Sequence, residues 1–203
     1  INPEDMKSYD GHACATNCTV VPVVTPMIGM KSLGIKSVTI RTRQALSGAG
    51  WKLLFDAEAL SGNVNPFIPQ EEEKLIAELK YLLGIDVPVI ASCNRVSERD
   101  GHFVSVGVEL SRETTVEEVE ELMKIPTLGL PSSPKLVNEI IDDSPTRQEY
   151  LWNGNGMTTT VGNIRVEGNI VRYDALSHNT VRGAAGGVIL LAEFAVQESY
   201  ITK

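Results

Sequence analysis

Cys18 is the first residue of the sequence whose type and position could support chemistry. It stands at the front of a mostly apolar segment, 19–30, so that a helix there would begin with Asn17 and Cys18. A thiolate is a good nucleophile when its pKa is lowered, and the free N–H groups and dipole of a helix start have that effect. The alternative is a small buried apolar residue, the commoner role of a lone cysteine, and Cys14 and Cys93 carry only that interpretation.

A metal site near Cys18 is not expected. Cys14 and Cys18 stand four residues apart with His12 close by. However, no second pair of ligands follows at the spacing of a zinc site.

His102 and Arg95 could act beside such a nucleophile. His102 follows an Asp-Gly turn at the expected start of a strand, where an imidazole facing a cleft can serve as a general acid or base. It could equally be a surface histidine, as could His12 and His178. Arg95 could hold a carboxylate through two parallel N–H bonds, or could form an ordinary salt bridge at a strand end.

Two further segments could contact a ligand. Glu71–Lys74 opens a predicted helix, and its usual role is a solvated face that suits the helix dipole. Residues 179–187, NTVRGAAGG, place glycines at a helix start, where the backbone can approach a ligand or a neighbouring helix closely. The chain contains no strand–glycine loop–helix fingerprint of a dinucleotide site.

The elements that must position these residues follow from the periodicity of the first half. Residues 35–44 alternate apolar and polar, which predicts a strand, and 71–83 place their apolar side chains on one helical face before Gly84. Residues 87–95 and 102–110 predict two strands, and the polar segment between them suggests an antiparallel pair.

The second half adds strands and helices without strict alternation. Thr115 to Glu118 is a capping box that opens a helix, and 126–145 is expected to be a long functional or crossing loop. Residues 157–176 predict a hairpin around Glu167-Gly168-Asn169, and a helix over 180–199 closes the chain. The expected fold class is therefore α+β, with a mixed, largely antiparallel sheet and flanking helices.

Composition narrows the function classes. The 203 residues carry a formal net charge of −8 without any Lys/Arg cluster, which argues against a nucleic acid or an anionic membrane as partner but allows a small anionic substrate. Three cysteines are an odd number that suits a reducing compartment, so a cytoplasmic location is expected. No apolar run reaches the about 18 residues of a membrane span, and the first residues are too polar for a signal peptide.

Seven motifs follow one another along the chain and carry more information together than singly. They are Thr16-Asn17-Cys18-Thr19, Arg43–Gly50, Asn65–Ile68 with Glu71–Lys74, Asn94-Arg95-Val96 with Asp100-Gly101-His102, Leu130–Pro134, Gly156-Met157 with Val161-Gly162, and His178–Gly186. In this order they resemble the aspartate-semialdehyde dehydrogenases of the archaeal and fungal branch, which also includes malonyl-CoA reductases. The resemblance runs from about Asn17 to Ala195.

The resemblance implies catalytic roles for matched residues. Cys18 falls at the position of the nucleophile, Gln44 at that of a glutamine that orients the acyl intermediate, and His102 at that of the acid/base. Arg95 falls where the family clamps the substrate carboxylate.

Four more residues match binding positions. Glu71 is implied as the acid that holds the substrate amine and Lys74 as the lysine that binds phosphate. Asn179 and Gly183 resemble positions that contact NADP.

The implied reaction is the NADPH-dependent reductive dephosphorylation of L-4-aspartyl phosphate to L-aspartate 4-semialdehyde through a cysteine thioester, in the biosynthesis of lysine, threonine and methionine. One alternative is malonyl-CoA reduction, and one of another class is a non-catalytic dimerisation or interaction module. The sequence departs from the family pattern at Thr16 and Ser97, where a proline is usual, and at Arg43 and Trp51, where a tyrosine is usual. Such changes could alter which acyl group fits.

The resemblance also predicts how the chain is divided. Residues 1–15 are expected to be the tail of an N-terminal NADP-binding Rossmann domain that this chain lacks, and 16–178 to be the catalytic and dimerisation domain. Residues 179–203 are expected to form a helix that packs on the cofactor domain. The expected fold resembles the C-terminal domain of glyceraldehyde-3-phosphate dehydrogenase. The implied assembly is a homodimer or tetramer, and the fragment alone is expected to be inactive.

Overall fold

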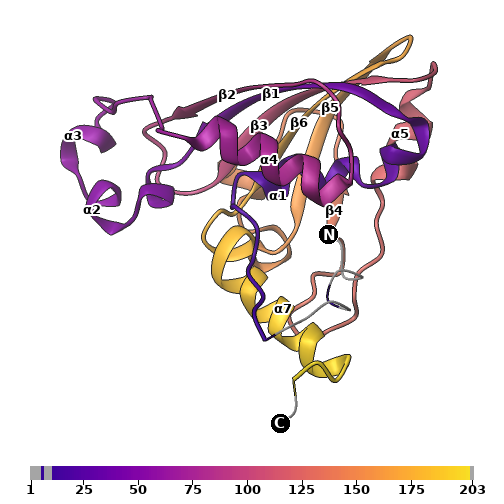
Figure 1. The fold of residues 1–203 in the computed structure, drawn as a ribbon. Helices are drawn as coiled ribbons and strands as arrows, with labels where there is room; N and C mark the ends of the chain where they lie inside the picture. The colour runs from indigo at the N-terminus through magenta and orange to yellow at the C-terminus, as the bar shows by residue number, and fades with distance from the viewer. Residues whose placement is uncertain (1–5, 7–10, 202–203) are drawn as a thin grey trace.

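A computed structural model describes residue 6 and residues 11–201 of the chain, and six strands in it form one mixed sheet (Figure 1). The strands are β1 (Ile35–Gln44), β2 (Val89–Arg95), β3 (His102–Leu110), β4 (Asn138–Ile140), β5 (Thr159–Glu167) and β6 (Ile170–Ser177). Their order in the sheet is β2-β1-β3-β6-β5-β4, with β1–β2 and β4–β5 parallel and the other neighbours antiparallel. The predicted α+β class with a mixed, largely antiparallel sheet is confirmed.

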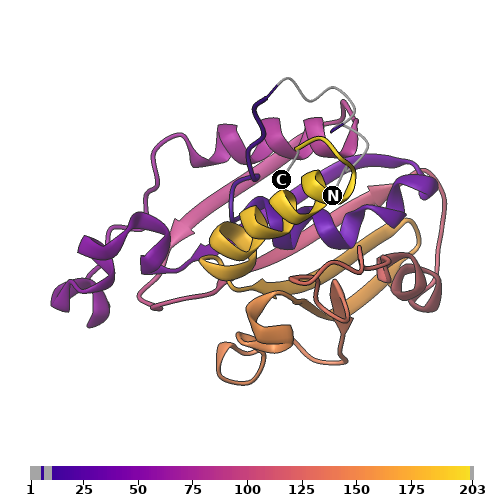
Figure 2. The ribbon, with the colours of Figure 1, turned by 90° about the horizontal axis from the view of Figure 1, so that it is seen from below.

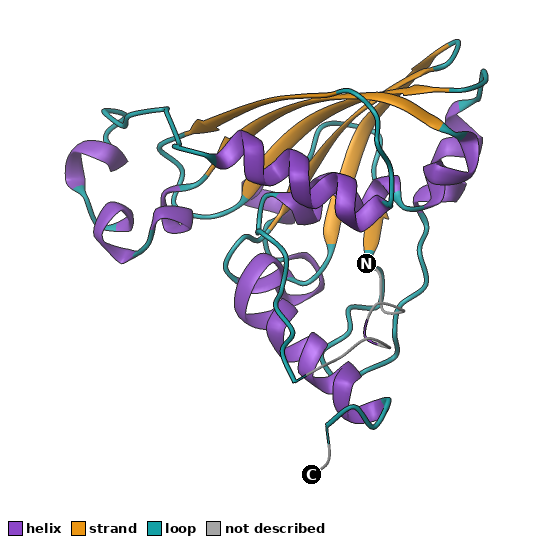
Figure 3. Ribbon diagram, viewed as in Figure 1, coloured by secondary structure: helices purple, strands orange, loops and turns teal. Residues whose placement is uncertain are grey.

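Helices cover one face of this sheet. The α-helices are α1 (Val20–Met27), α2 (Trp51–Leu54), α3 (Ala57–Leu60), α4 (Glu71–Leu83), α5 (Val116–Met123), α6 (Arg147–Tyr150) and α7 (Gly186–Gln197). In Figures 1 and 3, α1, α4 and α5 lie under the sheet and α7 lies below them, and Figure 2 shows α4, α1 and α7 crossing the same face. None of these described helices is long and apolar enough to cross a membrane.

The alternation along β1 separates a core face from an open face. Val38, Ile40 and Gln44 are buried toward the helices, whereas Arg41 and Arg43 point to the other side and are exposed. This follows because successive side chains of a strand point to opposite faces of the sheet. The side chains of one face form the main hydrophobic core together with α1 and α4. The same alternation turns Gln44, at the end of the strand, toward the helices.

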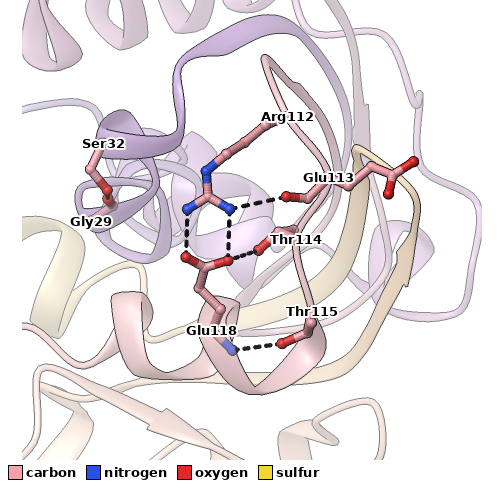
Figure 4. A network of polar contacts seen from close by, with 7 residues as sticks. All are labelled: Gly29, Ser32, Arg112, Glu113, Thr114, Thr115 and Glu118. Carbon is pink, nitrogen blue, oxygen red and sulfur yellow. Dashed lines mark hydrogen bonds and ion pairs between the residues drawn. The ribbon is translucent and has the colours of Figure 1, made fainter.

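One half of the capping box predicted at Thr115–Glu118 is present at the start of α5 (Figure 4). The Thr115 hydroxyl accepts a hydrogen bond from the Glu118 N–H at 3.3 Å. The Glu118 carboxylate does not return to Thr115 but binds both terminal nitrogens of Arg112, at 2.6 and 3.0 Å, and the Thr114 hydroxyl at 2.6 Å. Side chains that precede the helix therefore provide hydrogen-bond partners for both the carboxylate and the backbone N–H of Glu118.

The predicted pairing of the strands at 87–95 and 102–110 is wrong. The two segments are strands and run in opposite directions, but β1 lies between them, bonded to β2 in parallel and to β3 antiparallel. Local periodicity predicts the strands, whereas their neighbours depend on contacts made over long sequence separations.

The remaining assignments agree closely with the structure. β1 and α4 have the bounds predicted for them, and β5 and β6 form the predicted hairpin with Gly168 at a φ of 62°. The segment 126–145 is irregular apart from β4. The final helix begins with a π-helical turn, Val181–Ala185, before α7.

Candidate active site

Three strand ends meet at one edge of the sheet and bring three of the predicted residues together. Gln44 ends β1 and lies opposite Arg95, which ends β2, and His102 begins β3 on the other side of β1. The ends of β1 and β2 reach the same edge as the start of β3 because β3 runs antiparallel to both. All three side chains are buried on the helix-covered face.

Cys18 lies directly against His102. Its Sγ is 3.3 Å from the Nε2 of His102, although 84 residues separate the two in sequence. Cys18 precedes α1, as predicted, and His102 is fully buried, so the surface alternative for this histidine is wrong. The pair has the geometry of a nucleophile beside a proton-carrying group.

A backbone contact fixes the tautomer of His102. The N–H of Ala45 donates to Nδ1 at 3.1 Å, so Nδ1 carries no proton and the neutral ring holds its proton on Nε2, facing Cys18. Burial, followed by the nearby charges of Arg95 and Arg147, lowers the pKa of His102 to about 3. At neutral pH the imidazole is therefore neutral and presents a donor to the sulfur.

The expectation that the helix start lowers the pKa of Cys18 is wrong. Burial raises the pKa of the thiol, and the Glu71 carboxylate raises it further. Two amides near this helix start are also already used, because the Asn17 N–H donates to Glu78 at 2.8 Å and the Thr19 N–H donates to the Asn17 side chain at 2.8 Å. Without ligands, the pair is a thiol beside a neutral imidazole.

Arg95 is held close to His102 by the turn after β1. Its Nη1 donates to the carbonyl of Ala45 at 2.6 Å. A Cβ on Gly48 would lie 2.9 Å from that Nη1 and 3.0 Å from the Cε1 of His102, so a larger residue here would have to displace Arg95 or His102. The guanidinium retains further N–H donors for an anionic group.

Glu71 is buried, so the expectation of a solvated side chain is wrong at this position. Its Oε1 accepts from the hydroxyl of Thr19 and the Nε2 of Gln44, both at 3.0 Å, and from the Nδ2 of Asn17 at 3.2 Å. Lys74, nearly one turn further along α4, is exposed. Glu71 thus links the segment around Cys18 to Gln44.

Asn179 links two segments of the site, the turn before His102 and the turn after β1. Its Oδ1 accepts from the N–H of Gly101 at 2.8 Å, and its Nδ2 donates to the hydroxyl of Ser47 at 2.8 Å. Gly183 packs against Cys18 itself, and a Cβ on this glycine would lie 2.5 Å from the Cβ of Cys18. Contact of Asn179 and Gly183 with a cofactor stays a prediction.

Two buried polar atoms near Gly183 have no hydrogen-bond partner in the part of the chain that the structure describes. They are the Nε of Arg182 and the Nε2 of His178. The buried position of His178, whose ring lies 4.4 Å from that of Trp152, corrects the expectation of a surface histidine. A cavity of about 770 Å³ lies on the other side of Gly183, between α7, α1 and the loop after α5, and Arg182 lines it. Among the described residues, no three acidic, histidine or cysteine side chains are placed to hold a metal ion.

Two contributors were missed in the sequence. Glu78 accepts from the backbone of the Cys18 segment, and Arg147 donates to the carbonyls of Gly101 at 3.2 Å and Arg43 at 3.4 Å. The spacing of seven residues between Glu71 and Glu78 could have indicated that both carboxylates share one face of α4. The sequence offers no comparable indication for Arg147, which reaches the site from the start of α6.

Known proteins resemble this chain over nearly all of its length. The family description "Semialdehyde dehydrogenase, dimerisation domain" matches residues 24–182. An aspartate-semialdehyde dehydrogenase of Archaeoglobus fulgidus is 38% identical over 99% of the chain and 65% of its own length. A malonyl CoA reductase (NADP) of Metallosphaera sedula is 29% identical over 94% of the chain and 58% of its own length.

Solved structures agree with these matches. The aspartate-semialdehyde dehydrogenase of Candida albicans, solved with NADP, superposes with a TM-score of 0.73 at 30% identity, over 93% of this chain and 58% of that one. Aspartate-semialdehyde dehydrogenase II of Vibrio cholerae has the same fold, with a TM-score of 0.80 at 20% identity, over 98% of this chain and 67% of that one.

The fold is therefore that of a semialdehyde dehydrogenase dimerisation domain. The chain belongs to the aspartate-semialdehyde dehydrogenase family. It spans about 65% of the length of the Archaeoglobus relative and 58% of the length of the Metallosphaera relative.

Proposed function

We propose that this chain is the catalytic and dimerisation part of an enzyme that reduces L-4-aspartyl phosphate to L-aspartate 4-semialdehyde with NADPH. The observation that carries the proposal is the 3.3 Å contact between the Sγ of Cys18 and the Nε2 of His102, at a sheet edge that also holds Arg95 and Gln44. The names of the relatives at 38% and 30% identity support the choice of substrate and cofactor.

Cys18 supplies the electrons of the first step. Its sulfur forms a bond to the acyl carbon while the bond from that carbon to the phosphate oxygen breaks, and phosphate leaves with the electron pair and the thiol proton. The product is a thioester on Cys18, which replaces one difficult reduction with two easier steps.

NADPH, when bound, supplies the hydride that reduces the thioester carbon. The oxygen of that carbon then carries a negative charge, which the Nε2–H of His102 is placed to stabilise by donation. As the carbon–oxygen double bond re-forms, the carbon–sulfur bond breaks and its electron pair returns to Cys18, which takes up a proton from solvent to restore the thiol. The semialdehyde is released.

Arg95, Glu71 and Lys74 bind the substrate in this proposal. Arg95 clamps the α-carboxylate, for which it has N–H groups beyond the one given to Ala45. Glu71 holds the amine through Oε2, whose hydrogen bond to Asn17 is 3.3 Å long. Lys74 is exposed and meets the phosphate.

The residues around Gly183 fit an anionic cofactor such as NADP. The Nε of Arg182 is buried and has no hydrogen-bond partner among the described residues, and burial lowers the pKa of the guanidinium. An anionic group of NADP beside it would compensate that burial. Asn179 and Gly183 complete this side of the site, and the greater part of the NADP site belongs to an N-terminal domain beyond this chain.

Two exposed surfaces of the domain, on α7 and on the open face of the sheet, are available for contacts in the whole enzyme. Val188 and Ile189 on α7 are 51% and 53% exposed, which supports the packing of residues 179–203 on the N-terminal cofactor domain whose tail is predicted at 1–15. The open face of the sheet offers a surface for a homodimer, in keeping with the family description. Residues 1–5 and 7–10 of that tail lie outside the described structure. A cytoplasmic location and a tetramer stay predictions.

Malonyl-CoA reduction is the second candidate, because it uses the same cysteine and histidine with CoA as the leaving group. The 29% identity to the Metallosphaera enzyme favours keeping it. The Arg43 side chain lies over the ring of Phe103 at 5.1 Å on the open face of the sheet, away from Cys18, so of the two departures only Ser97 stays a candidate for changing the acyl pocket. A non-catalytic module, the third candidate, has no physical need for a close Cys18–His102 contact.

The experiment compares two reactions of the full-length protein. Phosphate-dependent oxidation of aspartate semialdehyde with NADP is expected to exceed CoA-dependent turnover of malonyl-CoA with NADPH by at least about 100-fold in kcat/KM, a difference typical of a site built for one polar substrate. The reverse ratio would establish the malonyl-CoA alternative. No turnover in either assay, by a folded dimer, would favour the non-catalytic module.

A further inference from the structure

Two carboxylates of α4 face the segment that carries Cys18. Glu71 and Glu78 stand seven residues apart, which is about two helical turns, so their side chains emerge on the same face of the helix. Leu75 and Leu79 on that face are fully buried. The helix is therefore fixed in the core at the same face that presents the two acids.

Glu78 holds the residues immediately before Cys18. Its Oε2 accepts from the backbone N–H of Asn17 at 2.8 Å and from the hydroxyl of Thr16. Glu71 holds residues on both sides, through the Nδ2 of Asn17 and the hydroxyl of Thr19. The positions before and after Cys18 are thus bonded to α4, while the sulfur itself remains directed at His102.

Asn17 connects the two carboxylates. Its backbone N–H goes to Glu78, its Nδ2 to Glu71, and its Oδ1 accepts the Thr19 N–H at 2.8 Å. Because a carboxylate accepts such bonds more strongly than a neutral group, these contacts restrain the turn around Cys18. Loss of the Glu78 contacts would free the backbone on one side of the nucleophile.

We propose that Glu78 is a positioning residue for Cys18, which it keeps within reach of His102 by holding Thr16 and Asn17. The expected effect on kcat rests on the proposed function, whereas the geometry rests on the hydrogen bonds that Glu78 accepts. Glu78 contacts neither Arg95 nor Lys74 in the structure, so it acts on the chemical step rather than on substrate binding. A nucleophile displaced by about 1 Å can lose about 100-fold in rate.

The test measures kcat and KM of the full-length enzyme in phosphate-dependent oxidation of aspartate semialdehyde. Glu78→Ala is expected to lower kcat about 10- to 100-fold and to leave KM within about twofold, because the substrate-binding groups are unchanged. Glu73→Ala is the matched control, since Glu73 is an exposed glutamate of the same helix. It is expected to leave both constants unchanged.

Two further variants separate positioning from general stability. Glu78→Gln keeps an acceptor oxygen for the Asn17 N–H and is expected to recover kcat to within about threefold of the wild type. Thr16→Val added to Glu78→Ala is expected to cause no further loss, because both changes remove the same contact. The rate at which iodoacetamide modifies the Cys18 peptide, followed by mass spectrometry, is expected to change in Glu78→Ala but not in Glu73→Ala.

Three results would overturn the proposal: an unchanged kcat in Glu78→Ala, an equal loss in Glu73→Ala, or additive losses from Thr16→Val and Glu78→Ala. Failure of the proposed function is distinguishable from these, since it would appear as turnover that persists in Cys18→Ala. If Cys18→Ala is inactive and Glu78→Ala is fully active, only the positioning role fails. The iodoacetamide rate does not depend on which reaction the enzyme catalyses.

Discussion

Gly183 and Cys18 pack so closely that no side chain fits between them. A Cβ placed on Gly183 would lie 2.5 Å from the Cβ and 2.8 Å from the Cα of Cys18. The start of the last helix therefore restrains the position of the nucleophile in addition to α4. Position 183 therefore requires a glycine for this packing, whether or not Gly183 also contacts NADP.

Gly183→Ala is expected to displace Cys18 from His102, because the contacting atoms are the backbone and Cβ of Cys18 rather than the end of a flexible side chain. Overpacking of this kind costs about 1–3 kcal/mol of unfolding free energy, and kcat should fall by at least about tenfold. Urea denaturation and steady-state kinetics measure the two effects. Gly107→Ala is the control, since its Cβ would meet only Thr39 at 3.9 Å. An equal free energy of unfolding in Gly107→Ala and Gly183→Ala would contradict the close packing described here.

His102 makes stability depend on pH in a defined direction. The pKa of its buried ring is lowered to about 3, whereas an unfolded histidine has a pKa of about 6.5. Below about pH 6.5 the unfolded chain binds a proton that the folded chain does not, so the free energy of unfolding falls as the pH falls, by at most about 1.4 kcal/mol per pH unit.

The measurement compares urea denaturation at pH 7 and pH 5 in the wild type and in His102→Asn, whose Oδ1 can replace Nδ1 as acceptor. The wild type should lose about 2 kcal/mol more than the variant between these pH values. His12→Asn, at an exposed position, should behave like the wild type. An equal loss in wild type and His102→Asn would show that His102 is not the buried neutral group described here.

Asn179→Ala is expected to destabilise the protein by about 1–3 kcal/mol, because it leaves the N–H of Gly101 without its acceptor. The Asp100-Gly101 turn leads directly into His102, so kcat should fall as well. Asn94→Ala, which removes an exposed contact to Ser92, is the comparison and should be neutral within about 0.5 kcal/mol. Thermal unfolding that is the same in both variants would contradict the bridging role of Asn179.

The local elements could be predicted from the sequence because their causes are local. The alternation over 35–44 and the apolar face of 71–83 gave the bounds of β1 and α4, and Gly168 indicated the hairpin of β5 and β6. The site residues Cys18, Gln44, Arg95 and His102 were assigned through the resemblance, and the structure places them together. Spacing alone left each of them with a structural alternative.

The rest depends on contacts between distant segments. The insertion of β1 between β2 and β3 cannot be read from the short segment that joins β2 to β3. The burial of Glu71 and the raised pKa of Cys18 arise only when α4 packs beside α1. An acidic first turn is usually solvated, and a cysteine at a helix start usually has a lowered pKa, so tertiary contacts reverse both expectations here.

The most direct test of the central claim is a single turnover of the full-length protein with aspartate semialdehyde and NADP in the absence of phosphate. A covalent mechanism predicts a burst of about one NADPH per subunit and an acyl adduct on the Cys18 peptide, which phosphate then removes. Cys18→Ser should give neither the burst nor the adduct. Turnover that persists without the Cys18 thiol, or an adduct on Cys14 or Cys93 alone, would contradict the account.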